Sequence, residues 1–425
     1  MEIQADRRGG SEGGDVSEWI GAAEAAQRLG IKPASLYSYV SRGVLSPRRG
    51  SDGRASLFDA AEVADLARRG RPRRAPGGAE LVIETALTEI SDDRLRFRGH
   101  DAIGLATSRS FEDVAGLLWT GSFGDAAVSG PWQATGEAIA AGTAAQAALP
   151  PGTYPLERLQ VIVPAVAATD RLRLHLDRPA VIAAARGLIA GMVDCLPAAG
   201  QDSGEASHAW AGDRSIAGRL AVRLCLRPPS VGLIGALRAA LVLLADHELA
   251  ASTLAARVAA SVRADPYAVV GAGLGAMSGA LHGGASLGAE VMLEAAGGPD
   301  DAARVVGVLL RRGERIPGLG HFVYQTGDPR SVLLLDLIRA AAPESARLAV
   351  AEAVLAEARR RALPAPNIEF ALAVLSAVAG MIPGGGEAVF AVARTAGWLA
   401  HALEEYARAT PIRPRGVYIG PPPAT

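Results

Sequence analysis

The chain has little cysteine, almost no lysine and few aromatic residues. Its 425 residues include two cysteines, Cys195 and Cys225, a single lysine, Lys32, and only 4% aromatic residues. Two cysteines without a CxxC spacing exclude a disulfide framework, and they favour a reducing, cytoplasmic setting. The scarcity of aromatic residues beside abundant alanine and leucine favours helices over strands.

An apolar segment typical of a signal peptide or a membrane span is also missing. Residues 1–18 are polar and rich in glycine, and they predict a disordered lead-in. The closest approach to a membrane span is 267–289, which is uncharged but contains seven glycines. That composition predicts a tightly packed core helix instead, and we expect no membrane partner.

Motifs of several well-known enzyme classes are absent. The sequence has no GxGxxG dinucleotide fingerprint, no GxxxxGK[ST] phosphate loop, no GxSxG nucleophile elbow and no two histidines spaced four apart. These absences argue against nucleotide-binding, serine hydrolase and metal-site templates. We therefore expect neither a metal ion nor a permanently bound cofactor.

Charge is distributed unevenly along the chain, although its formal net value is only −1. Between Arg28 and Arg74, eleven basic residues stand against four acidic ones, a local net charge of +7 that leaves −8 for the remainder. Residues 71–80, rich in Arg, Pro and Gly, predict a linker. The sequence thus predicts a small basic domain at 19–70 and a larger acidic body, with a polyanion partner for the small domain only.

The basic domain predicts two helices in close succession. Residues 22–29 predict a helix that Gly30 ends, and Pro33 suits the first position of a second helix, 33–42. Two helices joined by so short a turn predict a helix-turn-helix. Residues 44–58 predict the two strands of a wing, and Asp59 is expected to cap a third helix, 60–69.

This segment resembles the winged helix-turn-helix of MerR-type regulators and excisionases, in LGIKPASLYSYVSRGVLSPRR followed by a Gly-Arg wing. The resemblance implies double-stranded DNA as a partner. The residues implied for the major groove are Ser35, Tyr37, Ser38 and Arg42, and those for phosphates or the minor groove are Arg48, Arg49 and Arg54. A protein-interaction or dimerisation module with a solvated arginine face is the open alternative.

In the body, apolar segments at helical spacing alternate with Pro and Gly breaks, so we expect a mainly α fold. Three histidines interrupt these segments: His247, His282 and His321. Each alone could be a structural histidine on a helix face, turn or loop. Three arginines also stand out: Arg330, Arg394 and Arg413. Their bidentate forks suit a substrate with two carboxylates.

Six motifs in this order resemble the citrate synthase family over about 81–418: RFRGHDAIGLATSRSFEDVAGLLWTG, ADHELAASTLAARVAAS, GAMSGALHGGA, GHFVYQTGDPR, PNIEF and ARTAGWLAHALEE. The resemblance implies a mainly α homodimer. Its large domain would comprise 81–282 and 389–425, its small mobile domain 283–388, and its active site the cleft between them.

Position by position, the resemblance implies that oxaloacetate is bound by His247, His321, Arg330 and Arg394, with Arg413 contributed by the other subunit. His282 would stabilise the enol of acetyl-CoA, His321 would polarise the ketone, and Glu369 would remove the methyl proton. The residues implied for CoA are Gly318, Leu319, Gly320, Gln325 and Asn367.

Some positions depart from the family pattern. Glu369 stands where the family has Asp, and a carboxylate moved by roughly 1 Å can cost ~10²-fold in rate. Phe322 and Gln325 stand where basic residues are common. Two hypotheses follow: an enzyme using acetyl-CoA or propionyl-CoA, to give citrate or 2-methylcitrate, and a DNA-binding regulator whose body senses a metabolite.

Overall fold

Helices dominate the part of the chain that the computed structural model describes. That part comprises residues 19–29, 45, 47–49, 56–64, 83–200, 213–280, 282–324, 327–408, 410–415 and 420. The chain separates into two units, Met1–Ile83 and Glu84–Thr425.

The N-terminal unit contains a short antiparallel sheet and a helix. Its elements are β1 (Trp19–Gly21), α1 (Ala22–Leu29), β2 (Arg48–Arg49) and β3 (Ser56–Asp59). The strand order is β1-β3-β2, with β3 antiparallel to both neighbours. A small core that includes Ile20, Leu45 and Phe58 holds these elements together.

Several predictions for this unit can be compared with its described residues. Helix α1 has the predicted bounds, and β2 and β3 pair within the segment predicted as a wing. The Asp59 carboxylate accepts a hydrogen bond from the Ala61 backbone N–H (2.7 Å), so it caps the helical residues 60–64 as expected. Strand β1 was not predicted.

The predicted second helix, 33–42, lies outside the described residues, and so do the side chains of Ser35, Tyr37, Ser38, Arg42, Arg49 and Arg54. Arg48 is exposed in β2, and its guanidinium lies 5.4 Å from the centre of the Trp19 ring. The winged helix-turn-helix therefore stays a prediction.

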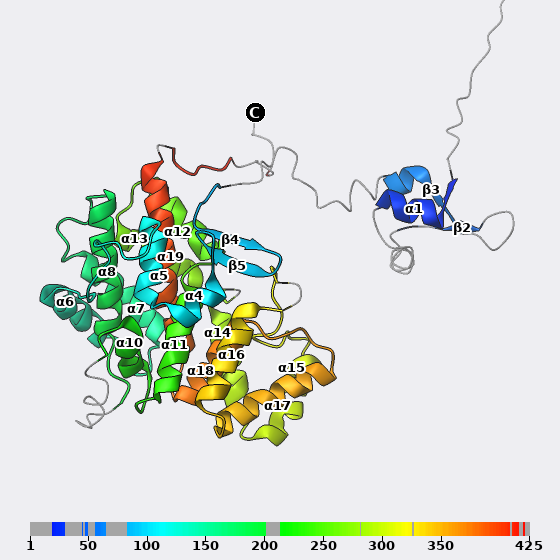
Figure 1. The fold of residues 1–425 in the computed structure, drawn as a ribbon. Helices are drawn as coiled ribbons and strands as arrows, with labels where there is room; N and C mark the ends of the chain where they lie inside the picture. The colour runs from blue at the N-terminus through cyan, green and yellow to red at the C-terminus, as the bar shows by residue number, and fades with distance from the viewer. Residues whose placement is uncertain are drawn as a thin grey trace, which may run out of the picture. The chain divides into compact units, whose positions relative to one another are not determined.

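The body begins with a second antiparallel sheet and continues with helices (Figure 1). Its strands are β4 (Thr88–Ser91), β5 (Arg94–Phe97) and β6 (His100–Asp101). The helices of its first half are α4 (Ala102–Ser108), α5 (Phe111–Thr120), α6 (Gly136–Ala147), α7 (Pro155–Ala167), α8 (Arg178–Asp194), α10 (Ile216–Leu224) and α11 (Val231–Leu244). Those of its second half are α12 (Ala251–Ser261), α13 (Pro266–Met277), α14 (Gly284–Glu294), η1 (Pro299–Asp301), α15 (Ala302–Arg311), α16 (Pro329–Ala341), α17 (Ala346–Arg360), α18 (Ile368–Ala379) and α19 (Gly385–Ala407).

Local sequence explains where many of these helices start and stop. Side chains of Ser, Thr, Asp and Asn accept backbone hydrogen bonds at several N-termini, as Ser110 does for α5 and Asn367 does for α18. Gly121 and Gly380 end α5 and α18 in the left-handed conformation, at φ 88° and 65°. Helix α18, which carries the predicted site residue Glu369, therefore has well-defined ends.

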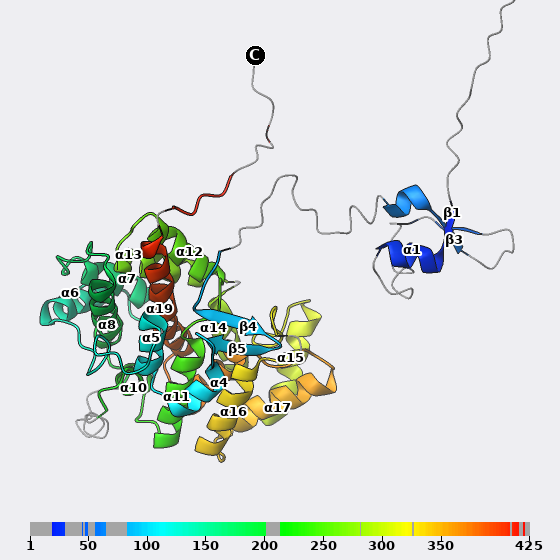
Figure 2. The ribbon, with the colours of Figure 1, turned by 45° about the horizontal axis from the view of Figure 1, so that its top comes forward.

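Helix α19 runs through the middle of the body and is buried along most of its length (Figures 1 and 2). It packs against α12 and α13 on one side and against α5, α8 and α11 on others. Close approach depends on glycine, because a Cβ at Gly273 of α13 would lie 2.6 Å from the Trp398 ring. Arg394 is thus held in the rigid interior.

Helices α14 to α18 gather in another part of the body, where α14 and α16 both contact α18 (Figure 1). The prediction of one core helix over 267–289 is wrong, because α13 ends at Met277 and α14 begins at Gly284. The intervening turn is tight: a Cβ at Gly283 would lie 2.6 Å from the Met277 carbonyl oxygen. This turn carries His282.

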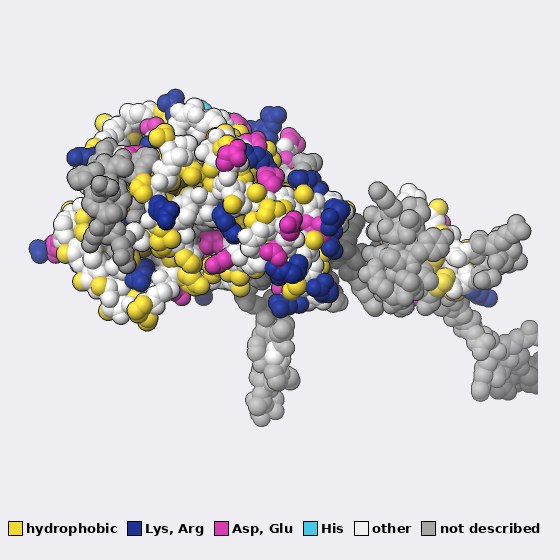
Figure 3. Space-filling model, turned by 90° about the horizontal axis from the view of Figure 1, so that it is seen from below, with side chains coloured by type: hydrophobic (Ala, Val, Ile, Leu, Met, Phe, Trp, Pro, Cys, Tyr) yellow, Lys and Arg dark blue, Asp and Glu magenta, His cyan; other side chains and the backbone are white. Residues whose placement is uncertain are grey.

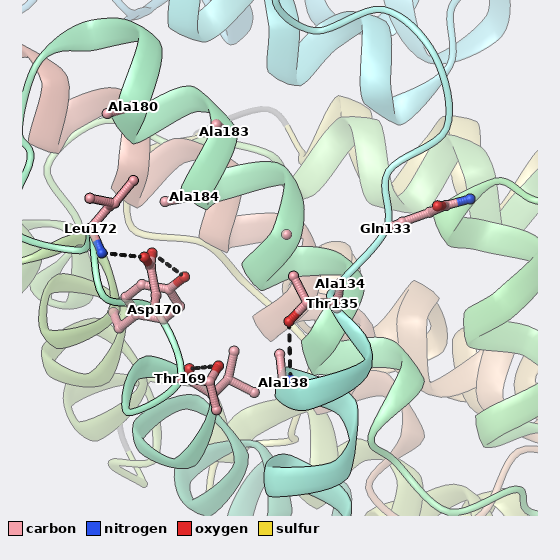
Figure 4. Close-up of a pocket in the computed structure, with 13 residues that line it drawn as sticks. Gln133, Ala134, Thr135, Ala138, Thr169, Asp170, Leu172, Ala180, Ala183 and Ala184 are labelled. Atoms are coloured by element: carbon pink, nitrogen blue, oxygen red, sulfur yellow. Dashed lines mark hydrogen bonds between the residues drawn. The ribbon is translucent and has the colours of Figure 1, made fainter.

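A separate apolar cavity of about 340 Å³ lies among α6, α7 and α8. Figure 4 shows Ala180, Ala183 and Ala184 of α8 on one side and Ala138 of α6 on another. Its Asp170 is engaged by the Leu172 N–H (2.8 Å) and the Tyr267 hydroxyl (2.9 Å). None of the predicted site residues lines this cavity.

The surface of the body mixes side chains of all kinds. Figure 3 shows hydrophobic, acidic and basic side chains interspersed on one face. Among the described helices, none is both long and apolar enough to cross a membrane.

Candidate active site

Six of the residues predicted for catalysis or oxaloacetate binding line one cavity of about 530 Å³: His247, His282, His321, Arg330, Glu369 and Arg394. They come from the loop after α11, the turn before α14, the loop before α16, and α16, α18 and α19 themselves. Asn367, predicted to contact CoA, lines the same cavity. The fold therefore brings together residues that are widely separated in the sequence.

Arg330 is held by a buried carboxylate that the motifs did not single out. Asp328 accepts hydrogen bonds from Nε (2.9 Å) and Nη2 (2.8 Å) of Arg330, and both side chains are buried. It also accepts the Ile368 N–H (2.9 Å) at the start of α18. Burial alone would raise the pKa of Asp328, but the Arg330 charge and these hydrogen bonds lower it, so the pair is ionised.

Arg394 is buried in a different environment. Its Nε donates to the Leu244 carbonyl (2.8 Å), and no described carboxylate lies within ion-pair distance. Burial lowers the pKa of Arg394 to about 10, opposed by the nearby charge of Asp246. Its guanidinium also lies over the Phe390 ring, 4.9 Å from the ring centre. Among the described residues only Nε donates a hydrogen bond, so the two Nη groups are available to an anion in the cavity.

A buried polar network fixes Asp246. Its carboxylate is hydrogen-bonded by the Thr88 hydroxyl (2.5 Å) and lies 3.3 Å from Nε2 of His401. Nδ1 of His401 lies 2.5 Å from Nη1 of Arg257, which can only donate, so the His401 proton belongs on Nε2 and points to Asp246. The counter-charge of Arg394 is thereby fixed in place.

His321 meets hydrogen-bond donors at both ring nitrogens. Its Nδ1 accepts the backbone N–H groups of Val323 (3.0 Å) and Tyr324 (3.3 Å). Burial and the charge of Arg330 lower the pKa of His321, so the ring is neutral near pH 7. Nε2 lies 3.4 Å from Nη2 of Arg330, which can also only donate. The two backbone donors at Nδ1 are closer, so they favour the proton of the neutral ring on Nε2, which can then donate to a substrate oxygen.

His282 is positioned by a serine. Its Nε2 lies 2.7 Å from Oγ of Ser252, which is buried in the first turn of α12. Burial, with a smaller effect of Arg394, lowers the pKa of His282 to about 4. The ring is thus a neutral hydrogen-bond donor rather than an imidazolium at neutral pH.

Glu369 lies in the first turn of α18, where its backbone N–H donates to the Asn367 side chain (3.0 Å). Its carboxylate faces the cavity and has no hydrogen-bond partner among the described residues. Burial raises the pKa of Glu369 to about 7, and the charges of Asp328 and Glu387 add to this effect while that of Arg330 opposes it. A carboxylate so tuned suits general-base chemistry at neutral pH.

The loop predicted to bind CoA is tied to the start of α18. The Asn367 N–H donates to the Gly318 carbonyl (2.9 Å), and its side-chain amide donates to the Gly320 carbonyl (2.8 Å). Leu319 and Gly320 line an adjoining cavity of about 620 Å³, which the fully exposed Phe322 also lines. Gln325 lies outside the described residues.

Arg413 is the predicted substrate residue that is not brought to this cavity. It is exposed in the segment 410–415 that follows α19. Within one chain, the cavity therefore has two arginines rather than three.

The sequence motifs did not single out three residues that contact the site: Ser252, Asp328 and Tyr324. Ser252 and Asp328 lie inside motifs already noted, ADHELAASTLAARVAAS and GHFVYQTGDPR. Their partners, His282 and Ile368, are 30 and 40 residues away. Such contacts form only in the folded chain, so the motifs alone do not indicate these partners.

Comparison with a solved structure defines the class of fold. The ternary complex of carboxymethyl coenzyme A and oxaloacetate with citrate synthase from Thermoplasma acidophilum superposes with a TM-score of 0.66 at 23% identity, over 82% of this chain and 96% of that one. The body therefore has the helical fold of citrate synthases.

Sequence comparison identifies the family. Residues 79–415 match the family model "Citrate synthase, C-terminal domain". The chain is 32% identical to citrate synthase from Haloferax volcanii, over 80% of this chain and 94% of that protein, and 29% identical to citrate synthase 2 from Bacillus subtilis, over 81% and 95%. The chain belongs to the citrate synthase family.

Proposed function

We propose that this protein condenses acetyl-CoA with oxaloacetate to give citrate and CoA. One observation carries the proposal: a single cavity gathers two buried arginines, three histidines and a glutamate whose pKa is raised to about 7. This set supplies anion binding, carbonyl polarisation and a base, the three requirements of an aldol-type condensation.

Oxaloacetate would be bound through its two carboxylates and its ketone. Arg330 and Arg394 offer guanidinium forks to carboxylates, and His247 and His321 offer neutral ring nitrogens. We infer that Arg413 of a second copy of the chain completes the grip, since Arg413 is exposed and absent from the cavity of its own chain. This inference requires a homodimer.

Glu369 would remove a proton from the methyl group of acetyl-CoA, while His282 donates a hydrogen bond to the thioester oxygen on which negative charge develops. The enolate carbon then attacks the ketone carbon, whose oxygen accepts a hydrogen bond from Nε2 of His321. The alkoxide so formed takes up the proton that Glu369 removed, relayed through water. Hydrolysis of the resulting thioester by water releases CoA and citrate. The neutral state of His282 supports its role as donor.

Propionyl-CoA is the alternative co-substrate, which would give 2-methylcitrate. The 2-methylcitrate synthase of Mycobacterium tuberculosis is 26% identical to this chain, over 82% of it and 91% of that protein. In either case we propose that Gly318, Leu319, Gly320, Gln325 and Asn367 contact the CoA portion, supported by the cavity beside His321. No permanently bound cofactor takes part in this scheme.

The direct test is release of free CoA thiol by the purified protein given oxaloacetate with acetyl-CoA or propionyl-CoA. We expect turnover of ~1 s⁻¹ or more with one of the thioesters, and its loss in His282→Ala. The ratio of the two rates identifies the acyl group. Absence of turnover with both thioesters, while oxaloacetate raises the melting temperature, would overturn the enzyme proposal.

A metabolite-sensing regulator that binds double-stranded DNA is the second candidate. It is favoured by the net charge of +7 over 28–74 and by the β2–β3 pair with its exposed Arg48. The Glu369→Asp variant separates the two candidates. A large rate gain from a near-inactive start would indicate lost catalysis and favour the regulator, whereas a fall from a substantial rate would show that Glu369 is the adapted base.

We also infer a division of the body into a large domain, 81–282 with 389–425, and a small domain, 283–388. Supporting this, α14 to α18 gather in one part of the body (Figure 1). Closure of the small domain would exclude water during condensation.

Two free, buried cysteines, Cys195 and Cys225, support a cytoplasmic location.

A further inference from the structure

Tyr324 contacts three of the residues that line the cavity. Its hydroxyl lies 3.0 Å from Nε2 of His247. Its ring centre lies 4.7 Å from that of His321, and the guanidinium carbon of Arg330 lies 5.2 Å from the ring centre. At 3% exposure, Tyr324 is enclosed behind these side chains rather than presented to solvent.

We infer that Tyr324 is a positioning residue for the keto-diacid substrate, whose hydroxyl orients His247 and whose ring supports Arg330 and His321. The inference rests on the proposed function, since it concerns the residues proposed to hold oxaloacetate. Tyr324 itself lines an adjoining cavity of about 350 Å³ rather than the main one, so it acts through its neighbours.

The hydroxyl of Tyr324 restricts the freedom of the His247 ring. The His247 ring is neutral near pH 7, because burial and the charges of Arg330 and Arg394 lower its pKa well below the usual value. Burial likewise raises the pKa of Tyr324 to about 12, so the phenol keeps its proton. A neutral imidazole has one donor and one acceptor. Engaging Nε2 therefore fixes the ring edge that remains for a ligand.

The ring of Tyr324 has a separate role. The guanidinium of Arg330 lies over its face, a cation–π contact inside a buried site. The rings of His247 and His321 meet edge to face at 71°, and that of Tyr324 is tilted by 42° to His321. The three rings form one cluster, so a shift of any one displaces the other two.

A conservative substitution separates the two roles. Tyr324→Phe removes the hydroxyl and keeps the ring, whereas Tyr324→Leu removes both. Tyr267→Phe is the matched control, since its hydroxyl also makes a partly buried hydrogen bond, to Asp170 beside the apolar cavity of Figure 4. A purely structural role predicts that Tyr324→Phe and the control behave alike.

The experiment is calorimetric titration of the full-length protein with oxaloacetate, together with the KM of each substrate and kcat. Tyr324→Phe is expected to weaken oxaloacetate binding ~5-fold, the effect of one neutral hydrogen bond, with the KM for acetyl-CoA within ~2-fold of the original. Tyr324→Leu is expected to weaken it further, and Tyr267→Phe to leave it unchanged.

Two results would overturn the inference while leaving the proposed function intact. One is unchanged oxaloacetate affinity in Tyr324→Phe. The other is an equal rise in the KM of both substrates with a melting temperature lowered as in Tyr267→Phe, which indicates a structural role only. If the unaltered protein bound no oxaloacetate, the proposed function would fail first and the inference with it.

Discussion

The cavity has a binding half, represented by Arg330, and a proton-transfer half, represented by Glu369. The charged groups of the two halves have opposite surroundings. Arg330, which would bind a carboxylate, is paired with the buried Asp328 through two side-chain hydrogen bonds. The Glu369 carboxylate, which would take a proton, has no hydrogen-bond partner among the described residues. A charge that must persist needs a counter-charge, whereas a base for a very weak acid needs a pKa near neutrality, and burial without a partner provides it.

The largest effect is expected when the base is removed and its shape is kept, because catalysis should be lost while substrate binding persists. Glu369→Gln is expected to lower kcat ~10³-fold, the usual contribution of a general base, and to leave oxaloacetate affinity within ~2-fold. Thiol release and calorimetry measure the two quantities. Glu137→Gln, in the exposed first turn of α6, is the control. Retention of more than a tenth of the turnover would exclude Glu369 as the base.

Breaking the buried ion pair should damage the binding half. Asp328→Asn leaves Arg330 charged and without its counter-ion, and we expect the free energy of unfolding to fall by about 3 kcal/mol, with oxaloacetate binding lost. Urea denaturation measures the first effect. Asp336→Asn, which removes an exposed ion pair to Arg339, should change stability by less than about 1 kcal/mol. An equal loss of stability in the two variants would contradict the claim that Arg330 depends on its buried counter-charge.

The smallest of these effects is expected for the serine behind His282. Ser252→Ala removes the 2.7 Å contact that orients the ring, and kcat should fall ~10-fold with oxaloacetate affinity unchanged. Steady-state kinetics checks this split. Ser129→Ala, which removes a loop hydroxyl bonded to the Asp125 carbonyl, should have no effect. A loss of oxaloacetate affinity instead would assign Ser252 to the binding half.

The sequence motifs predicted the residues that line the cavity better than the residues that hold those side chains in place. His247, His282 and His321 stood out because they interrupt apolar or glycine-rich segments. Arg330 and Arg394 stood out because arginine forks suit a substrate with two carboxylates. Their partners did not stand out, because a single Asp, Ser or Tyr acquires its role only from groups brought near by folding. The Asp328 to Ile368 hydrogen bond, for example, joins the starts of two helices 40 residues apart.

Helix boundaries were likewise predicted correctly only where local chemistry sets them. The prediction for 22–29 was confirmed, since Gly30 ends a helix through local chemistry. The prediction of one helix over 267–289 was wrong, because its glycines permit a tight turn at Gly283 that composition alone does not distinguish from close helix packing. That turn brings His282 to the cavity.

The central claim is that burial tunes Glu369 for proton transfer, and the pH dependence of kcat/KM for acetyl-CoA tests it most directly. The base must be ionised, so the rate should be constant above its pKa and fall tenfold per pH unit below it. With the pKa of Glu369 raised to about 7 by burial, the limb should bend near pH 7 and disappear in Glu369→Gln. His282, whose pKa is lowered to about 4, should add no limb in this range. A profile that stays flat between pH 5.5 and 8 would contradict the account.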